Sequence, residues 1–343
     1  MKKLFLFFAL IVGLLTSAST LQAQTVNMSR YITLNVKRGA SISLNFKAAA
    51  AGTHVRIISG LNFKNITVGT DWIGMATYTA GSTTMTVYGD ITGFSCSNNG
   101  TKLTAIDLSH NTQLEWLRCE ENNLTTLDMS NNTQLKELAC NNNNLTTLDV
   151  SGCTQLKELN CGSNNLTAID LSHNTQLTNL YCPQNQFSSL DVSHNTQLEW
   201  LRCEENNLTT LYMSHNTQLK RLACYLNQLT SLNVSNNTQL EWLYCSDNNL
   251  SSLDVSGCTK LTKLFCYNNN LTTLDVSGRT QLEILECYNN NLTTLDVSGC
   301  TQLEELYCYG NNFSTQALDR IYCALPNRIA TTNGKIYPLV NSS

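Results

Sequence analysis

Apolar and polar residues repeat along most of the chain with one fixed period. In LEWLRCEENNL, apolar residues stand at Leu114, Leu117 and Cys119, and apolar residues return at these places every 21 residues. The alternation here predicts a short strand with Leu117 and Cys119 pointing inward. Trp116 and Arg118 then point outward. Such a unit cannot bury its apolar side alone, so the period predicts a solenoid of stacked units.

One cysteine marks each unit, and we count one partial unit and ten full units between residues 91 and 312. After Cys96 in the partial unit, the cysteines are Cys119, Cys140, Cys161, Cys182, Cys203, Cys224, Cys245, Cys266, Cys287 and Cys308. Each takes a position that a core residue fills, so we interpret the column as buried thiols rather than a metal site. The stretch HNTQLEWLRCEENNLTTL occurs twice, starting at residues 110 and 194.

An asparagine follows the strand in every unit, as at Asn122, Asn143 and Asn164. A buried turn leaves backbone donors and acceptors that one side-chain amide can satisfy together, so these residues predict an asparagine ladder. A second position holds only His, Asn or Gly, which tolerate positive φ. There we predict a left-handed turn, at His110, Asn131, Gly152, His173, His194, His215, Asn236, Gly257, Gly278 and Gly299.

The pattern L-x-x-L-x-L-x-x-N-x-L, with cysteine in place of the third leucine, resembles the leucine-rich repeat. A 21-residue unit with a cysteine ladder is similar to the internalin J-like proteins and to leucine-rich repeat surface proteins of the Bacteroidetes. The resemblance implies a horseshoe-shaped solenoid with a parallel β-sheet on its concave face. It also implies a bacterial, adhesin-like protein that binds host or neighbouring-cell surfaces through that face.

The N-terminal sequence predicts an exported protein. Residues 1–23 have two lysines, an apolar stretch and a small residue at their end, which are the features of a signal peptide. No later stretch is apolar for long enough to insert into a membrane, and no anchor is visible in the sequence. We therefore expect a secreted or cell-surface protein.

The segments on either side of the units predict caps, which open solenoid ends require. Residues 313–343 contain a helical pattern at 314–326 and a hairpin signal about Asn333 and Gly334. Residues 24–90 indicate a small β domain, because apolar and polar residues alternate in several stretches. These stretches are residues 31–37, 41–47, 54–59 and 83–89.

Composition and motifs exclude several functions. The formal net charge is −4 and no run of Lys or Arg occurs, which excludes nucleic acid as a partner. No Ser/His/Asp constellation, zinc motif or phosphate loop stands apart from the repeat, so we predict neither an enzyme nor a cofactor. His173, His194 and His215 lie on consecutive units, but the predicted left-handed turn explains them without a metal.

The outward positions of the strands are not set by the repeat and are free to serve a ligand. Early units have small or polar residues there, so the repeat does not demand aromatic side chains. Trp, Tyr and Arg together have the composition of a binding hot spot. The predicted partner-binding residues are Trp116, Arg118, Tyr181, Trp200, Arg202, Tyr225, Trp242, Tyr244, Phe265, Tyr267, Tyr288, Tyr307 and Tyr309.

Three kinds of partner fit this surface. A protein is the first hypothesis, because eleven strands spaced by ~4.8 Å span about 48 Å, enough for a standard protein interface. A glycan is the second, because flat Tyr and Trp rings offer apolar platforms with polar rims. A structural surface component that associates only with copies of itself is the third.

The fifteen cysteines of an exported chain would usually form disulfides. Parallel side chains ~4.8 Å apart, however, seldom offer the required torsion of ~±90°. Cys153, Cys258 and Cys300 share a turn position, and the closest two stand ~9.6 Å apart; Cys323 has no readable partner. We predict free thiols, so a thiol titration of the denatured, unreduced protein should count nearly all of them. A count in which most are blocked would contradict this.

Overall fold

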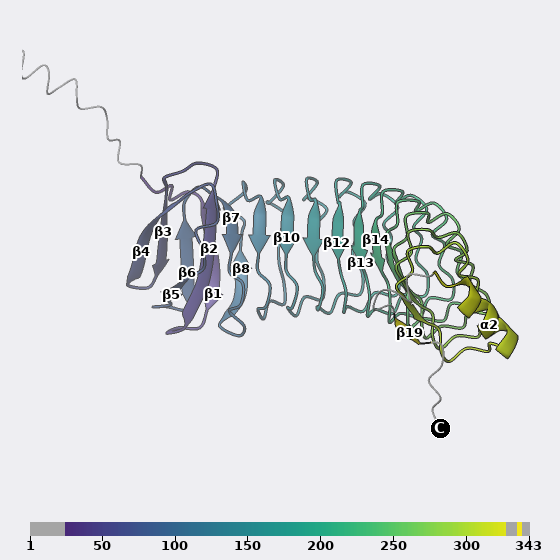
Figure 1. Ribbon diagram of the computed structural model, residues 1–343. Coiled ribbons are helices and arrows are strands. Elements are labelled where there is room, and N and C mark those ends of the chain that lie inside the picture. The colour runs from purple at the N-terminus through teal and green to yellow at the C-terminus, as the bar shows by residue number, and fades with distance from the viewer. Residues whose placement is uncertain (1–24, 327–334, 338–343) are drawn as a thin grey trace, which may run out of the picture.

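The computed structural model describes residues 25–326 and 335–337 (Figure 1). The predicted signal peptide and the predicted turn about Asn333 and Gly334 lie outside these residues. The described chain forms an N-terminal β-sandwich, a long solenoid and a short C-terminal helix. No helix in this part of the chain is long and apolar enough to cross a bilayer.

The N-terminal sandwich has two antiparallel layers. One layer has the strand order β4-β3-β6-β1-β8, and in the other β2 lies between β5 and β7. Four of these strands, β1, β2, β3 and β6, coincide with the predicted stretches. The sequence did not predict β4 and β5, because their side chains are mostly exposed. The strands are β1 Tyr31–Val36, β2 Ser41–Ala48, β3 Thr53–Ser59, β4 Asn62–Val68, β5 Ala76–Thr79, β6 Thr84–Tyr88, β7 Ile91–Ser95 and β8 Leu103–Asp107.

The solenoid carries one three-residue strand per rung, and the strands form a parallel sheet on the concave face of a horseshoe. Neighbours are in register, with Leu117 opposite Leu138. The strands are β9 Trp116–Arg118, β10 Glu137–Ala139, β11 Glu158–Asn160, β12 Asn179–Tyr181, β13 Trp200–Arg202, β14 Arg221–Ala223, β15 Trp242–Tyr244, β16 Lys263–Phe265, β17 Ile284–Glu286 and β18 Glu305–Tyr307. The first of them, β9, pairs with β7, which also pairs with β2. The sandwich sheet therefore continues into the solenoid without a break.

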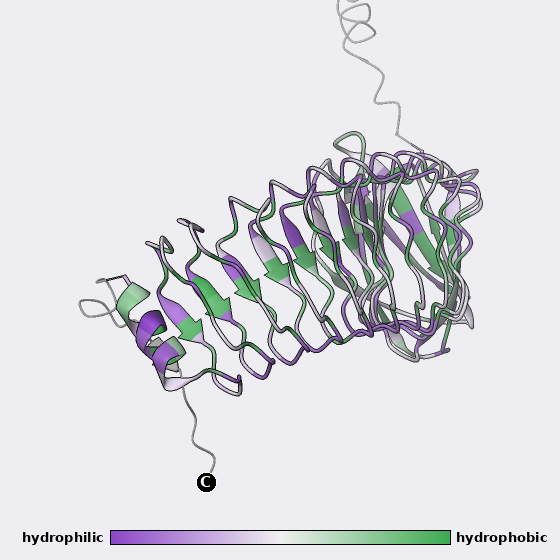
Figure 2. Ribbon diagram, turned by 90° about the vertical axis from the view of Figure 1, so that its right-hand side faces the viewer, coloured by the Kyte–Doolittle hydropathy of each residue, from purple (hydrophilic) through white to green (hydrophobic). Residues whose placement is uncertain are grey.

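The core consists of columns of identical side chains. In every rung the central residue of the strand and the following cysteine are buried, as at Leu117 and Cys119. Hydrophobic segments accordingly recur along the strands in Figure 2. Burying one leucine side chain contributes roughly 1.5–3 kcal/mol, and this gain is repeated rung by rung. The predicted inward column is thus present, and it extends to Cys96 in the partial unit.

The predicted asparagine ladder links each rung to the next. At Asn164, Nδ2 donates to the carbonyl oxygens of Cys161 and of Cys140 one rung earlier, both at 3.1 Å. Its Oδ1 accepts from the backbone N–H of Leu145 at 3.0 Å. The same side chain therefore closes its own turn and holds the preceding rung. In the partial unit, Asn99 instead exchanges hydrogen bonds with Ser43 of the sandwich.

The left-handed turns do not lie where the sequence analysis put them. Positive φ occurs immediately before each ladder asparagine, as at Glu121 (57°) and Leu226 (52°). The ladder amide must reach carbonyls two and three residues back, and this tight bend requires the left-handed conformation even for a side chain that disfavours it. Among the predicted positions only Gly278 and Gly299 have positive φ. The prediction is wrong for His110, Asn131, Gly152, His173, His194, His215, Asn236 and Gly257.

A second asparagine ladder occupies the position after the mispredicted turn residue, and the sequence analysis missed it. For example, Asn174 is fully buried and donates to the carbonyl oxygens of Val150 (3.0 Å) and Cys153 (2.9 Å). Cys153 itself takes an asparagine position, and its Sγ lies 3.7 Å from the carbonyl oxygen of Asn132. Cys258 and Cys300 occupy the same column. The recurring Asn in S-H-N-T was the signal that could have revealed this ladder.

The C-terminal helix α2, Thr315–Ala324, covers the last rung together with β19, Lys335–Tyr337. Ser314 caps the helix by accepting a hydrogen bond from the N–H of Ala317 at 3.1 Å. Ile321 is buried against the solenoid core, and β19 pairs in parallel with β18. The predicted helix is therefore present.

Replacing Asn164 with Ala should destabilise the protein by ~1–3 kcal/mol, because the buried N–H of Leu145 loses its acceptor and buried carbonyls in two rungs each lose one of two amide donors. Urea unfolding followed by circular dichroism measures this loss. The matched control is Asn165→Ala, whose side chain is exposed and should change stability by no more than about 0.5 kcal/mol. Equal effects of the two substitutions would contradict the role of the ladder.

Candidate functional site

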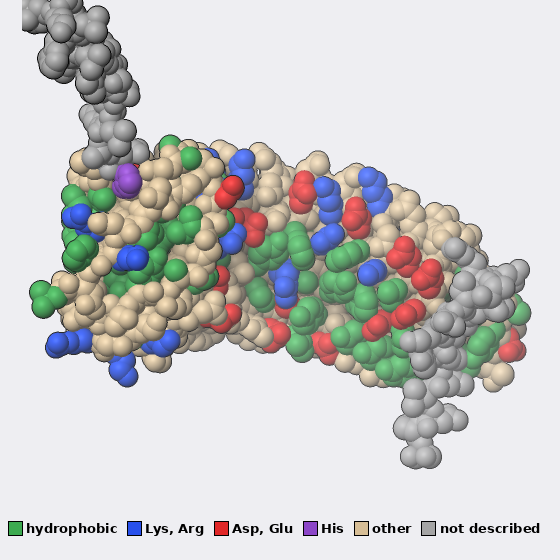
Figure 3. Space-filling view, turned by 60° about the vertical axis from the view of Figure 1, so that its left-hand side comes forward, with side chains coloured by type: hydrophobic (Ala, Val, Ile, Leu, Met, Phe, Trp, Pro, Cys, Tyr) green, Lys and Arg blue, Asp and Glu red, His purple; other side chains and the backbone are tan. Residues whose placement is uncertain are grey.

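The predicted partner-binding residues all lie on the strand face of the solenoid, at the two ends of each strand or directly after the ladder cysteine. The strand ends are mostly half-buried, whereas the central leucine is fully buried. The short strands thus hold outward side chains at fixed intervals. Figure 3 shows hydrophobic side chains gathered on the solenoid, with acidic and basic side chains among them.

Ring contacts connect the aromatic side chains from rung to rung. Trp242 contacts Tyr244 at a centroid distance of 6.3 Å, and Tyr244 contacts Phe265 at 4.6 Å. One rung earlier than Trp200, Tyr181 packs edge-on against it at 5.1 Å. We call the following set the aromatic face: Tyr181, Trp200, Trp242, Tyr244, Phe265, Tyr267, Tyr288, Tyr307 and Tyr309.

Three tyrosines of this face form a parallel stack. Tyr267 and Tyr288 lie 4.4 Å apart with an interplanar angle of 5°, and Tyr288 and Tyr309 lie 4.6 Å apart at 11°. Both ring faces of Tyr288 are therefore covered by its neighbours. Burial, followed by the adjacent tyrosines, raises the pKa of the Tyr288 hydroxyl well above its usual value. The stack therefore leaves the ring edges, rather than the faces of Tyr288, available for contacts.

Arg221 is a member of this surface that the sequence analysis missed. Its guanidinium carbon lies 4.9 Å from the ring centroid of Trp200 and 4.0 Å from that of Trp242. Lys263 approaches Trp242 from the next rung, at 4.9 Å. Cation–π contacts contribute about 0.5–2 kcal/mol each and fix the orientation of both tryptophans. The signal was available, because Arg221 stands in the same repeat position as the tryptophans.

The two copies of the duplicated stretch have different surroundings. In the first copy, Trp116 lies under the ammonium of Lys47 from the sandwich, 3.7 Å from the centroid. Arg118 lies over Trp72 at 5.3 Å and forms an ion pair with Glu137 at 2.8 Å. These contacts are made within the chain. The first copy thus helps to join the sandwich to the solenoid.

In the second copy, the arginine pairs with an acid of its own rung. The Nε of Arg202 donates to the carboxylate of Glu204 at 2.8 Å. Only 1% of Glu204 is exposed, because it folds back under the arginine. A hollow of about 460 Å³ adjoins the pair and is also lined by Tyr181 and Trp200. Gly162 forms part of its wall, where a Cβ would meet the Cδ of Pro183 at 2.8 Å.

The acidic side chains on the same sheet add negative charge beside the rings. Glu158 lies next to Glu137, and burial, reinforced by that neighbour, raises the pKa of Glu158. Burial and the neighbouring Glu305 do the same for Glu286. The face therefore combines an apolar surface with partly desolvated carboxylates and with Arg221.

The described residues contain no group of three or more His, Cys, Asp or Glu side chains placed to hold a metal. His173, His194 and His215 each place Nδ1 within 3.1–3.3 Å of the preceding serine hydroxyl. That contact is local and does not bring the three rings onto a common ligand. It replaces the left-handed turn as the structural explanation for these histidines.

A family model for leucine-rich repeats matches residues 133–173, 238–278 and 280–320. The chain is also similar to the functional domain of InlJ from Listeria monocytogenes, which includes a cysteine ladder. The identity is 40% with a TM-score of 0.64, over 68% of this chain and 53% of InlJ. The chain is a leucine-rich repeat protein. It belongs with those whose repeats carry a buried cysteine.

More distant structures agree with this assignment. A leucine-rich repeat protein of Leptospira interrogans shares 26% identity over 60% of this chain and 57% of its own, with a TM-score of 0.55. The internalin InlF from Listeria monocytogenes shares 21% identity over 67% of this chain and 77% of its own, with a TM-score of 0.57. At this identity the similarity shows the fold alone. No curated protein matches the chain. Leucine-rich repeat proteins of the internalin type generally mediate contacts between proteins.

The cysteines of this leucine-rich repeat protein should differ sharply in reactivity. Burial raises the pKa of Cys153 and of Cys258 to about 11 and that of Cys161 to about 12. At about pH 8 these thiols are therefore neutral as well as buried, and thiols do not react without ionising. Among the cysteines, Cys323 alone is exposed.

Iodoacetamide at about pH 8 should thus modify the native protein at Cys323 only, and the urea-unfolded protein at every cysteine. Mass spectrometry of the intact chain counts the labels. Cys323→Ser is the control and should leave the native protein unlabelled. Labelling of ladder cysteines at the rate of Cys323 would show that the rungs open.

Proposed function

We propose that this leucine-rich repeat protein is exported and binds a protein partner at a cell surface through the aromatic face. The observation that carries the proposal is a series of half-buried rings on consecutive rungs: Arg221 and ring contacts connect Trp200 to Phe265, and the tyrosine stack runs from Tyr267 to Tyr309. Clustered Trp, Tyr and Arg are the residues that dominate binding energy at protein interfaces. The similarity to InlJ supports the same proposed function.

The ring geometry favours a protein over a glycan. A sugar binds an aromatic side chain by lying flat on an open ring face, and the Tyr267–Tyr288–Tyr309 stack covers both faces of Tyr288 and one face of each of its neighbours. The stack offers edges and hydroxyls, which suit the side chains and backbone groups of a polypeptide. Trp200 and Trp242 likewise have Arg221 over their rings.

The fixed positions of these aromatic side chains also support a protein interface. Ring stacking and cation–π contacts hold these side chains in place before a partner arrives, so little side-chain entropy remains to be lost on binding. Arg221 lies between the two tryptophans, and arginine is enriched together with aromatic residues at protein interfaces. The first-copy residues Trp116 and Arg118 are excluded from this proposed interface, because they contact the sandwich.

The double substitution Tyr244→Ala and Tyr267→Ala should weaken binding to intact target cells at least about tenfold, because both rings are central to the aromatic face. Flow cytometry with the labelled protein measures binding. Tyr212→Ala is the matched control, since Tyr212 is an exposed tyrosine of the same solenoid outside the sheet. Circular dichroism should show an unchanged fold in both variants.

Treating the cells identifies the class of partner. Loss of binding after protease treatment alone supports a protein receptor, whereas loss after periodate alone would replace it with a glycan. Self-association of the purified protein, abolished by the double substitution and without any binding to cells, would instead favour the structural surface component.

A further inference from the structure

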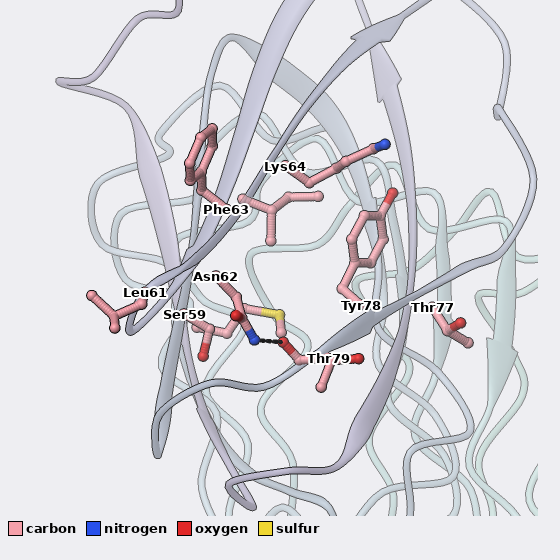
Figure 4. Close-up of a pocket in the computed structure, with 10 residues that line it drawn as sticks. Ser59, Leu61, Asn62, Phe63, Lys64, Thr77, Tyr78 and Thr79 are labelled. Atoms are coloured by element: carbon pink, nitrogen blue, oxygen red, sulfur yellow. Dashed lines mark hydrogen bonds between the residues drawn. The ribbon is translucent and has the colours of Figure 1, made fainter.

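A second cavity lies at the end of the sandwich that points away from the solenoid. Strand β4 is the last strand of one layer and β5 is the last strand of the other, so each has a neighbour on one side only. Between them is a cavity of about 720 Å³, shown in Figure 4. It is lined by Ile57, Ser59, Leu61, Asn62, Phe63, Lys64, Thr77, Tyr78, Thr79 and Met85.

One wall of the cavity is apolar, and the rest of its lining is polar. Ile57 and Met85 are buried in the sandwich core and form its inner wall. Phe63 and Leu61 form its rim, and 69% and 99% of these side chains are exposed. Leaving two large apolar side chains in water next to an apolar wall is unfavourable unless something covers them. The cavity is large enough for an alkyl chain.

The polar groups in the cavity define the chemistry of a ligand. Asn62 is already engaged with the carbonyl oxygen of Thr79 at 3.2 Å, and Ser59 donates to the carbonyl oxygen of Thr84 at 2.7 Å. Lys64 and Tyr78, by contrast, have no hydrogen-bond or ion-pair partner among the described residues. Both offer donors, and no carboxylate lines the cavity. A ligand must therefore bring an acceptor, and the ammonium favours an anionic one.

Lys64 and Tyr78 approach the cavity from opposite layers. Lys64 pairs in register with the buried Ile57, and Tyr78 with the buried Ile42, so both side chains project from the inner faces of the sandwich. Figure 4 shows the ammonium and the hydroxyl on the same side of the cavity. The net charge of the sandwich also favours an anionic ligand. Residues 24–90 contain six Lys and Arg and two Asp, a net charge of +4, whereas the whole chain has a net charge of −4.

We propose that the open end of the sandwich binds a single-chain anionic amphiphile, with its carboxylate or phosphate at Lys64 and Tyr78 and its alkyl chain against Ile57 and Met85. The site is separate from the aromatic face and independent of the proposed protein partner. An inward-pointing lysine on an edge strand also prevents that strand from pairing with another chain, so the test must separate ligand binding from edge protection.

Titration calorimetry with decyl phosphate, below the concentration at which it forms micelles, tests the proposal on the protein lacking only its signal peptide. One molecule should bind per chain. Lys64→Met should weaken binding at least about tenfold, because a charge-assisted contact to the anion is lost while the aliphatic stem is kept. Tyr78→Phe should weaken it less, and Lys37→Met, which removes the same charge outside the cavity, should leave it unchanged. Decyl glucoside, with the same chain and no charge, should bind at least about tenfold more weakly than decyl phosphate.

Three results would overturn the proposal. The first is absence of saturable binding, and the second is equal affinity in Lys64→Met. The third is binding to phosphatidylglycerol vesicles without binding to monomeric decyl phosphate, which would assign the basic end to a lipid bilayer surface. If Lys64→Met instead dimerises in sedimentation experiments while decyl phosphate has no effect on the native protein, Lys64 serves only to protect the β4 edge.

Discussion

The amide of the ladder asparagine is the interaction on which the rest of this structure depends. Each rung ends in a sharp turn packed against another rung, where water cannot reach the backbone carbonyls. One side chain supplies donors to two rungs and an acceptor to the preceding rung, so each unit is completed by its neighbour. The short strands, the buried cysteine column and the spacing of the outward residues all follow from that coupling.

Because buried residues define the repeat, the residues at outward positions can vary without changing the fold. The cysteine and leucine columns are nearly invariant, whereas the strand ends vary from Ala and Asn to Trp and Tyr without disturbing the register. Aromatic side chains at a regular spacing then meet each other, and Arg221 joins the two tryptophans on either side. The binding surface is therefore a consequence of stacking and needs no loop or hinge to assemble it.

The duplicated stretch shows how context changes the role of identical residues. Trp116 and Arg118 contact Lys47 and Trp72 of the sandwich, whereas Trp200 and Arg202 belong to the open face. The sandwich also extends the solenoid sheet through β7 and lends Ser43 to the asparagine ladder. It thus covers the first rung and also forms hydrogen bonds with it. The opposite end of the sandwich, at β4 and β5, is uncovered.

The sequence by itself determined the solenoid, the inward cysteine and leucine columns, the main asparagine ladder and the outward aromatic positions. It did so because each 21-residue unit packs against a near copy of itself. The pattern within one unit therefore also indicates which side chains contact the next unit. Only the tertiary structure decided which residue takes positive φ, which tryptophan contacts the sandwich and how Glu204 turns inward. These depend on carbonyls, rings and charges contributed by other segments, which no spacing along the chain encodes.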